Sequence, residues 1–177
     1  MTYSIRDQYL QNPWGFTDIR LRQTYQAVGD MFVPAFYIVI DYQTYSTAID
    51  ILPQAEAMLN AAEGYARISR TDEAMKYLHE LGKHVYHEYN ADKVHVDNLK
   101  LYYGMDDGAK ALLQYILFER RVQFLYKGLR WFDIRRYKLD VEHKMADGKT
   151  ILLSERNPNR NFQIPRAAIV SGMEPNQ

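Results

Sequence analysis

Residues 119–136, ERRVQFLYKGLRWFDIRR, bring side chains that can do chemistry close together in the sequence. The segment contains five arginines, four aromatic residues and two carboxylates in eighteen positions. This mixture is compatible with a basic patch for nucleic acid, a catalytic group, or a structural element in which arginines and carboxylates pair. The guanidinium group suits the structural element, because it donates several hydrogen bonds at once to carboxylates or carbonyls.

The spacing of the apolar residues favours the structural role. They recur at alternating steps of four and three, as one buried helical face requires: Phe118, Val122, Leu125, Leu129 and Phe132. Gly128 fits a helix C-cap or a kink, and the face is continuous if Gly128 only bends the helix. Asp133 lies one turn from both Arg130 and Arg136, so ion pairs can form along the helix.

Four residues of this segment are therefore expected to hold the fold: Arg130, Trp131, Asp133 and Arg135. If the ring of Trp131 is buried, Trp131→Ala should cost roughly 3–5 kcal/mol. Because acids alternate with bases here, a nucleic-acid patch is disfavoured. Lysine plus arginine equals aspartate plus glutamate, at 22 each in 177 residues, so the chain has no long-range field for a polyanion.

Other chemistry finds little support in the sequence. The chain has no cysteine, which excludes disulfides and thiol catalysis. No motif pairs two carboxylates as glycoside hydrolysis requires, and no phosphate loop, GxSxG or HExxH occurs. His84 and His87, near Glu80 and Glu88, are a weak candidate for a metal, and His–Glu pairs on a solvated face are the favoured interpretation. We therefore expect no catalytic residues, no cofactor and no metal.

The elements that must position the segment begin with a helical hairpin. The sequence predicts two antiparallel helices in residues 53–89, with a break at SRTD and an N-cap at Thr71 or Asp72. Tyr65, Ala74 and Leu78 match the spacing of a tetratricopeptide repeat, of which one copy is visible.

A single domain over residues 1–177 is expected, mainly α with long loops and a little β. Before the hairpin we expect an extended, irregular region at 1–50 with a short strand at 17–25. After it we expect a turn-rich linker at 90–107, with Asp106 or Asp107 as the next helix cap, and then signature helices at 108–138 (108–127 and 129–138). The remaining residues, 147–177, are expected to form a loop and short-strand tail, with its strand at 150–154 and a helical turn after Pro165.

The segment 119–136, followed by NFQIPRAAI, resembles the C-terminal signature of the SusD/RagB family, surface glycan-binding lipoproteins of Bacteroidetes. The hairpin segment AEAMLNAAEGYARISR resembles the repeat-like helix that precedes this signature in the family, so the resemblance covers about residues 53–170. The positions that match the signature are Glu119, Arg120, Arg121, Gly128, Arg130, Trp131, Phe132, Asp133, Arg135, Arg136, Phe162, Ile164 and Pro165.

The chain also departs from the family pattern. Lys127 stands where the family has glutamate, Gln163 replaces a proline, and the closing Asn-Pro-Gly-Tyr is absent. Family members are longer and begin with a lipoprotein signal and a lipid-bearing cysteine, and the N-terminal residues here contain no apolar signal segment. The resemblance is therefore to the C-terminal portion of the family.

The resemblance implies a SusD-like helical fold with tetratricopeptide-type hairpins. It implies non-catalytic binding of polysaccharide or oligosaccharide nutrients at the outer-membrane surface, for delivery to a TonB-dependent, SusC-like transporter. A membrane contact would be made only through a lipid anchor that this chain lacks, and no nucleic-acid partner is expected. One alternative is a helical-repeat protein–protein interaction module without glycan binding, and the least favoured is a glycan-active enzyme.

Aromatic residues outside the predicted helical core are the candidates for stacking on a sugar ring. They are Trp14, Tyr37, Tyr42 and Tyr45. A ring with a polar edge suits the flat face of a pyranose. The favoured alternative is that these rings fill gaps between helices, because most aromatic residues in proteins pack in the interior.

Overall fold

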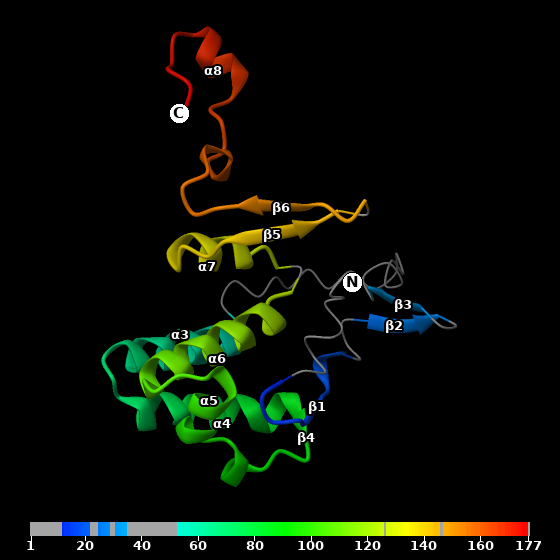
Figure 1. The fold of residues 1–177 in the computed structure, drawn as a ribbon, viewed down its shortest axis with the longest axis vertical. Coiled ribbons are helices and arrows are strands. Elements are labelled where there is room, and N and C mark those ends of the chain that lie inside the picture. The colour runs from blue at the N-terminus through cyan, green and yellow to red at the C-terminus, as the bar shows by residue number, and fades with distance from the viewer. Residues whose placement is uncertain are drawn as a thin grey trace. The chain divides into compact units, whose positions relative to one another are not determined.

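The computed structural model describes residues 12–21, 25–28, 31–34, 53–125, 127–145 and 147–176. It is mainly helical with minor strands, which confirms the expected fold class (Figure 1). The chain divides into two compact units. The N-terminal unit extends to Leu125, and the C-terminal unit contains the described residues that follow. The single domain expected from the sequence stays a prediction.

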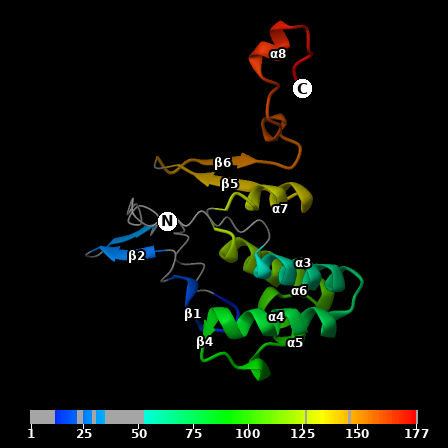
Figure 2. The ribbon, with the colours of Figure 1, turned by 180° about the vertical axis from the view of Figure 1, so that it is seen from behind.

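The N-terminal unit is built on the predicted helical hairpin, which the structure confirms. Helix α3 (Gln54–Arg67) and helix α4 (Thr71–Val85) pack against each other, and α6 (Gly108–Gln123) packs on α3. The three helices lie side by side from both directions of view (Figures 1 and 2). Ala62 and Ala74 are completely buried, and such small side chains let the helices of a hairpin approach closely. The N-cap position of α4 is Arg70, so the predicted cap at Thr71 or Asp72 is wrong.

The turn-rich linker expected at 90–107 is wrong, because the structure places a helix there. A 3-10 turn (Ala91–Lys93) leads into α5 (Val96–Tyr103), which packs against α6. Leu99 is completely buried, and it is the single buried residue of α5. One buried residue in eight gives no helical period in the sequence, so the pattern predicted a loop.

Asp107 caps α6, as predicted. Its carboxylate accepts hydrogen bonds from the backbone N–H groups of Ala109 (3.0 Å) and Lys110 (3.1 Å). These bonds lower the pKa of Asp107, because they stabilise its ionised form. The helix ends at Gln123, four residues before the predicted end.

Short strands lie at the edges of the N-terminal unit. Strand β1 (Thr17–Asp18) pairs antiparallel with β4 (Tyr86–His87), and β2 (Tyr25–Val28) pairs with β3 (Met31–Pro34). The continuous strand predicted at 17–25 is wrong, because Arg20 and Leu21 are helical. The β1–β4 pairing joins the start of the chain to the end of the helical hairpin.

The C-terminal unit contains the short helix α7 (Arg130–Arg136), a hairpin of β5 (Val141–Lys144) and β6 (Thr150–Leu153), a 3-10 turn (Pro158–Arg160) and α8 (Arg166–Val170). The short helix, the strand near 150–154 and the helical turn after Pro165 agree with the sequence prediction. Strand β5 was not predicted, because its sequence VEHK is polar.

The chain turns at Gly128 between two separate helices, so the condition for one continuous apolar face, a helix that only bends there, is not met. Gly128 has φ +74°, in the left-handed region that favours glycine, so the backbone turns there. Phe132, the last residue of the predicted face, is 66% exposed. The signature segment therefore divides into the end of α6 and the separate helix α7.

Candidate functional site

Among the described residues, a group of buried charged side chains surrounds Glu119 on α6. The Glu119 carboxylate, 1% exposed, accepts hydrogen bonds from Arg20 Nη1 at 2.9 Å and from the hydroxyl of Tyr86. Arg20 also forms a two-pronged contact with Asp18, through Nε at 2.9 Å and Nη2 at 2.6 Å. We call these four residues the Glu119 cluster.

Burial and charge act together on the pKa values of this cluster. Burial raises the pKa of Tyr86, and the negative charge of Glu119 raises it further. Burial acts to lower the pKa of Arg20, but the nearby Glu119 and Asp18 outweigh it, so the pKa is raised. Burial raises the pKa of Asp18, against the opposing effect of Arg20. The carboxylates are buried and bonded within the cluster, so they are not presented to a substrate.

The sequence analysis identified Glu119 but missed its partners. Asp18 and Arg20 lie 99 or more positions away, in a segment that the sequence predicts only as a short strand. Arg20 is buried, with 6% of its surface exposed. The neighbouring sequence does not indicate this, because the burial depends on contact with α6. The β1–β4 pairing provides the physical link, because it places Asp18 opposite Tyr86.

The signature arginine Arg120 joins two helices of the N-terminal unit. Arg120, 6% exposed, donates from Nη1 to the amide oxygen of Asn60 on α3 at 2.6 Å. Its guanidinium also lies over the ring of Phe124 at 5.3 Å. This contact fits the structural role that the sequence predicts for the segment.

The signature residues on α7 have mixed surroundings. Asp133 is 1% exposed and accepts a hydrogen bond from Arg136 Nη2 at 3.0 Å, one of the two ion pairs anticipated from the spacing. Trp131 is half-buried, whereas Phe132 and Arg135 are exposed. Asp133 is therefore buried, whereas Phe132 and Arg135 are accessible to solvent.

A cavity of about 470 Å³ lies in the C-terminal unit, and we call it the tail cavity. Its lining is Trp131, Arg135, Arg160, Asn161, Phe162 and Asn176. The rings of Trp131 and Phe162 are 6.5 Å apart and inclined at 59°. Arg135 Nη1 donates to Asn161 Oδ1 at 2.9 Å and to the carbonyl of Arg160 at 3.4 Å. Two aromatic rings thus share a cavity with guanidinium and amide groups.

Arg160 is a buried residue that lines the tail cavity, and the sequence analysis did not identify it. Its side chain is almost fully buried, and Nη2 donates to the carbonyls of Leu139 and Leu153, the latter at 2.6 Å. Leu153 ends β6, so the arginine ties the loop after the hairpin back to it. The sequence RNPNRN predicts a loop, and nothing in it distinguishes a buried arginine from a solvated one.

A smaller cavity of about 240 Å³ lies in the N-terminal unit. Side chains of α3 and α4, including Met58 and Leu81, line it together with Arg20, His84 and Gln123. Arg20 already belongs to the Glu119 cluster, and its Nη1 also donates to Gln123 Oε1 at 3.1 Å. Two polar groups of this cavity, Arg20 and Gln123, are therefore bonded to each other.

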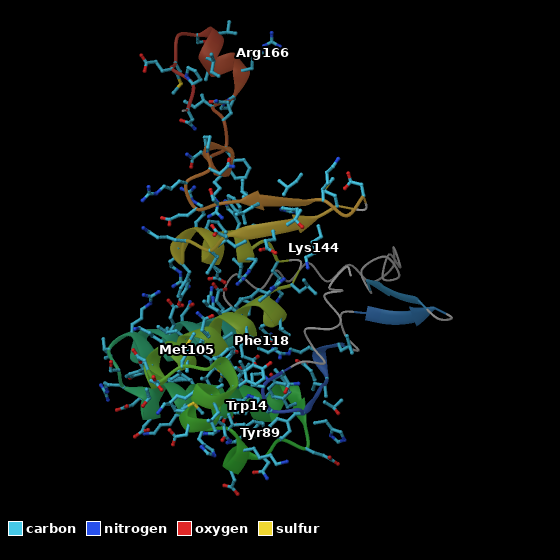
Figure 3. The ribbon with its side chains drawn as sticks, viewed as in Figure 1. Trp14, Tyr89, Met105, Phe118, Lys144 and Arg166 are labelled. Atoms are coloured by element: carbon cyan, nitrogen blue, oxygen red, sulfur yellow. The ribbon has the colours of Figure 1, made fainter. Side chains whose placement is uncertain are left out.

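Of the four aromatic sugar-binding candidates, the structure describes Trp14. Its ring meets the buried ring of Tyr115 on α6 edge-on, at 5.2 Å and 80°, and it lies among the helices of the N-terminal unit (Figure 3). This contact favours the packing alternative for Trp14. Tyr37, Tyr42 and Tyr45 lie outside the described residues.

The two histidines considered for a metal lie at the end of α4 and in β4. His84 Nε2 is 3.4 Å from Glu80 Oε1, and both His84 and His87 are exposed. In the parts of the chain that the structure describes, no group of three or more His, Cys, Asp or Glu residues is placed to hold a metal ion. Within the same parts, every helix is too short or too polar to cross a membrane.

Comparison with known proteins gives one family. The model of the SusD family matches residues 37–170, which is more than half of the chain. The match includes the α3–α4 hairpin, the Glu119 end of α6, and the described C-terminal unit as far as Val170. No curated protein matches the chain.

Proposed function

The chain belongs to the SusD family, and from this premise we propose that it binds polysaccharide or oligosaccharide nutrients without chemically changing them. SusD family membership suggests a nutrient-binding role in glycan uptake. In the proposed role the protein acts at the outer-membrane surface of a bacterium and passes its sugar to a TonB-dependent, SusC-like transporter. The observation that carries this proposal is the family match over residues 37–170.

The described site geometry supports binding more than catalysis. The buried carboxylates Asp18 and Glu119 share Arg20, and Asp133 is bonded to Arg136. Glycoside hydrolysis requires two carboxyl groups that both face the scissile bond. The tail cavity instead offers aromatic rings and hydrogen-bond donors, which suit the C–H faces and hydroxyls of a sugar.

Affinity electrophoresis on a polysaccharide panel, read beside an assay for released reducing sugar, tests this proposal. We expect the migration of the full chain to be retarded by at least one polysaccharide, with no sugar released. A heat-unfolded sample of the same protein serves as the control for non-specific retardation. Release of reducing sugar would support an enzyme instead. Neither retardation nor release across the panel would overturn glycan binding and favour a protein–protein interaction module.

A further inference from the structure

We propose that the tail cavity binds an acidic sugar, with Arg135 pairing to the carboxylate of a uronic-acid residue beside the rings of Trp131 and Phe162. This inference rests on the proposed glycan binding and adds the class of ligand and the residues that select it. Neither Arg135 nor Trp131 was predicted from the sequence to contact a ligand.

The charge of the cavity lining points to an anion. Two of the six lining residues are arginines, and none is a carboxylate. Arg160 is buried and held by the carbonyls of Leu139 and Leu153. Arg135 is exposed, and its guanidinium is the one that a ligand can reach.

The hydrogen bonds of Arg135 leave one side of its guanidinium available. Among the described residues, its bonds to protein acceptors are both made by Nη1, to Asn161 Oδ1 and to the carbonyl of Arg160. The remaining edge, Nε and Nη2, is a planar pair of donors. A carboxylate binds such a pair through two parallel hydrogen bonds, which are shorter and stronger than bonds between neutral groups.

The aromatic side chains supply a surface for the sugar ring. Phe162 is 84% exposed, which is unusual for a phenylalanine beside a cavity, and its ring is 6.5 Å from that of Trp131. Aromatic faces favour contact with an apolar surface, such as the C–H face of a pyranose. The cavity volume of about 470 Å³ lies within the range of roughly 300–1,000 Å³ that is typical of ligand sites.

The rim of the cavity is held in place by its own hydrogen bonds. Asn176 Nδ2 donates to the carbonyl of Phe162 at 2.7 Å, and the backbone N–H of Asn176 donates to Gln163 Oε1 at 2.8 Å. Asn161 is held by Arg135. Because these groups are positioned before a ligand arrives, binding loses less conformational entropy than it would at an unconstrained loop.

The test uses isothermal titration calorimetry of the full chain with a uronic-acid trisaccharide, trigalacturonate, and with its methyl ester. The ester keeps the shape of the sugar and removes its negative charge. We expect the acid to bind at least about tenfold more tightly than the ester, since a hydrogen bond to a charged group is stronger than one between neutral groups. Hydrogen exchange in a peptide covering 158–176 should slow when the acid binds, because the ligand covers this part of the chain.

Variants locate the effect on Arg135. Arg135→Gln should abolish the preference for the acid, and Arg135→Lys should retain part of it, because lysine keeps the charge without the planar donor pair. Phe162→Ala should weaken binding of acid and ester about equally. The control is Arg156→Gln, which removes an exposed arginine of the same unit that is outside the cavity lining and should leave both affinities unchanged.

The outcomes separate this inference from the proposed function. Equal affinity for acid and ester, or an acid preference that survives Arg135→Gln, overturns the acidic-sugar site. If the chain binds only neutral polysaccharides in electrophoresis, the site is overturned and the proposed function stands. If no glycan of either kind is bound, both are overturned.

Discussion

Glu119 shows how a single acidic residue in a signature can be structural. Its carboxylate receives hydrogen bonds from Arg20, two residues after β1, and from Tyr86 in β4, and no sequence pattern links these two residues to α6. Burying an ion pair costs desolvation energy, and the loss of one partner leaves the other charged and poorly satisfied. The stability of the N-terminal unit should therefore depend strongly on this one side chain.

Glu119→Gln should lower the free energy of unfolding by about 3 kcal/mol, because it leaves part of the buried Arg20 charge uncompensated while keeping the side-chain shape. Urea unfolding followed by circular dichroism measures the change. The control is Glu73→Gln, which removes a surface ion pair with Arg70 and should barely move the transition. Equal, small effects of the two substitutions would show that the Glu119 cluster does not stabilise the fold.

His79 gives a prediction about pH. Its Nδ1 lies 2.6 Å from the hydroxyl of Tyr89, and burial, together with the nearby Lys83, lowers the pKa of His79. A histidine whose pKa is lower in the folded state favours folding above its usual pKa of about 6.5, and this contribution is lost as the pH falls through the folded value. The melting temperature of the wild type should therefore fall more than that of His79→Gln between about pH 7.5 and 5.5. Parallel curves for the two proteins would contradict this assignment.

At the scale of the helices, Gly82 marks a close contact. A Cβ added to Gly82 on α4 would meet the ring of Tyr89, which is anchored by His79 and lies 5.7 Å from the ring of Phe16. Glycine in the middle of a helix is otherwise unfavourable by about 0.5–1 kcal/mol relative to alanine. Its presence here is explained by the neighbouring ring.

Gly82→Ala should destabilise the protein by about 1–3 kcal/mol, because overpacking outweighs the gain in helix propensity. Gly64→Ala in α3 is the matched control, because a Cβ there meets nothing within 4 Å. That substitution should stabilise the protein by about 0.5–1 kcal/mol. Thermal unfolding of the two variants measures whether each substitution stabilises or destabilises the protein. A stabilising effect of both substitutions would mean that Tyr89 moves aside freely.

The elements differ in how far the sequence could predict them. The α3–α4 hairpin was predictable because its buried residues recur with a helical period. The cap at Asp107 was predictable because an N-cap residue has a local signature. Helix α5 was not, since it buries only Leu99. At Gly128 the sequence left open a helix cap or a kink, and the structure has a left-handed turn between two helices. Whether glycine bends a helix or ends it depends on what the flanking side chains pack against, which local spacing does not report.

The candidate site was less predictable than the fold. The signature positions were found, but their partners Asp18, Arg20 and Asn60 are distant in sequence. The predicted cost of Trp131→Ala was conditional on a buried ring, and the ring is half-buried, so we now expect a cost below roughly 3 kcal/mol. The same exposure is what allows Trp131 to line the tail cavity.

At the scale of the whole molecule, the two units differ in how they are stabilised. The buried apolar side chains of the described residues all belong to the N-terminal unit, from Leu59 to Phe124. In the described part of the C-terminal unit the buried residues are instead polar, Asp133 and Arg160. Burial of apolar surface is the main favourable contribution to folding, at about 25 cal/mol per Å². The N-terminal unit should therefore carry most of the stability.

This difference predicts that the two units behave differently when separated. A fragment of residues 1–125 contains every buried apolar residue described and should unfold cooperatively, within about 5 °C of the main transition of the full chain. A fragment of residues 126–177 has no described apolar core and should show no cooperative transition by itself. Circular dichroism melting and amide hydrogen exchange of the two fragments measure this. Cooperative melting of the isolated C-terminal fragment, or its absence in residues 1–125, would show that polar contacts such as those of Arg160 contribute more to stability than apolar burial does.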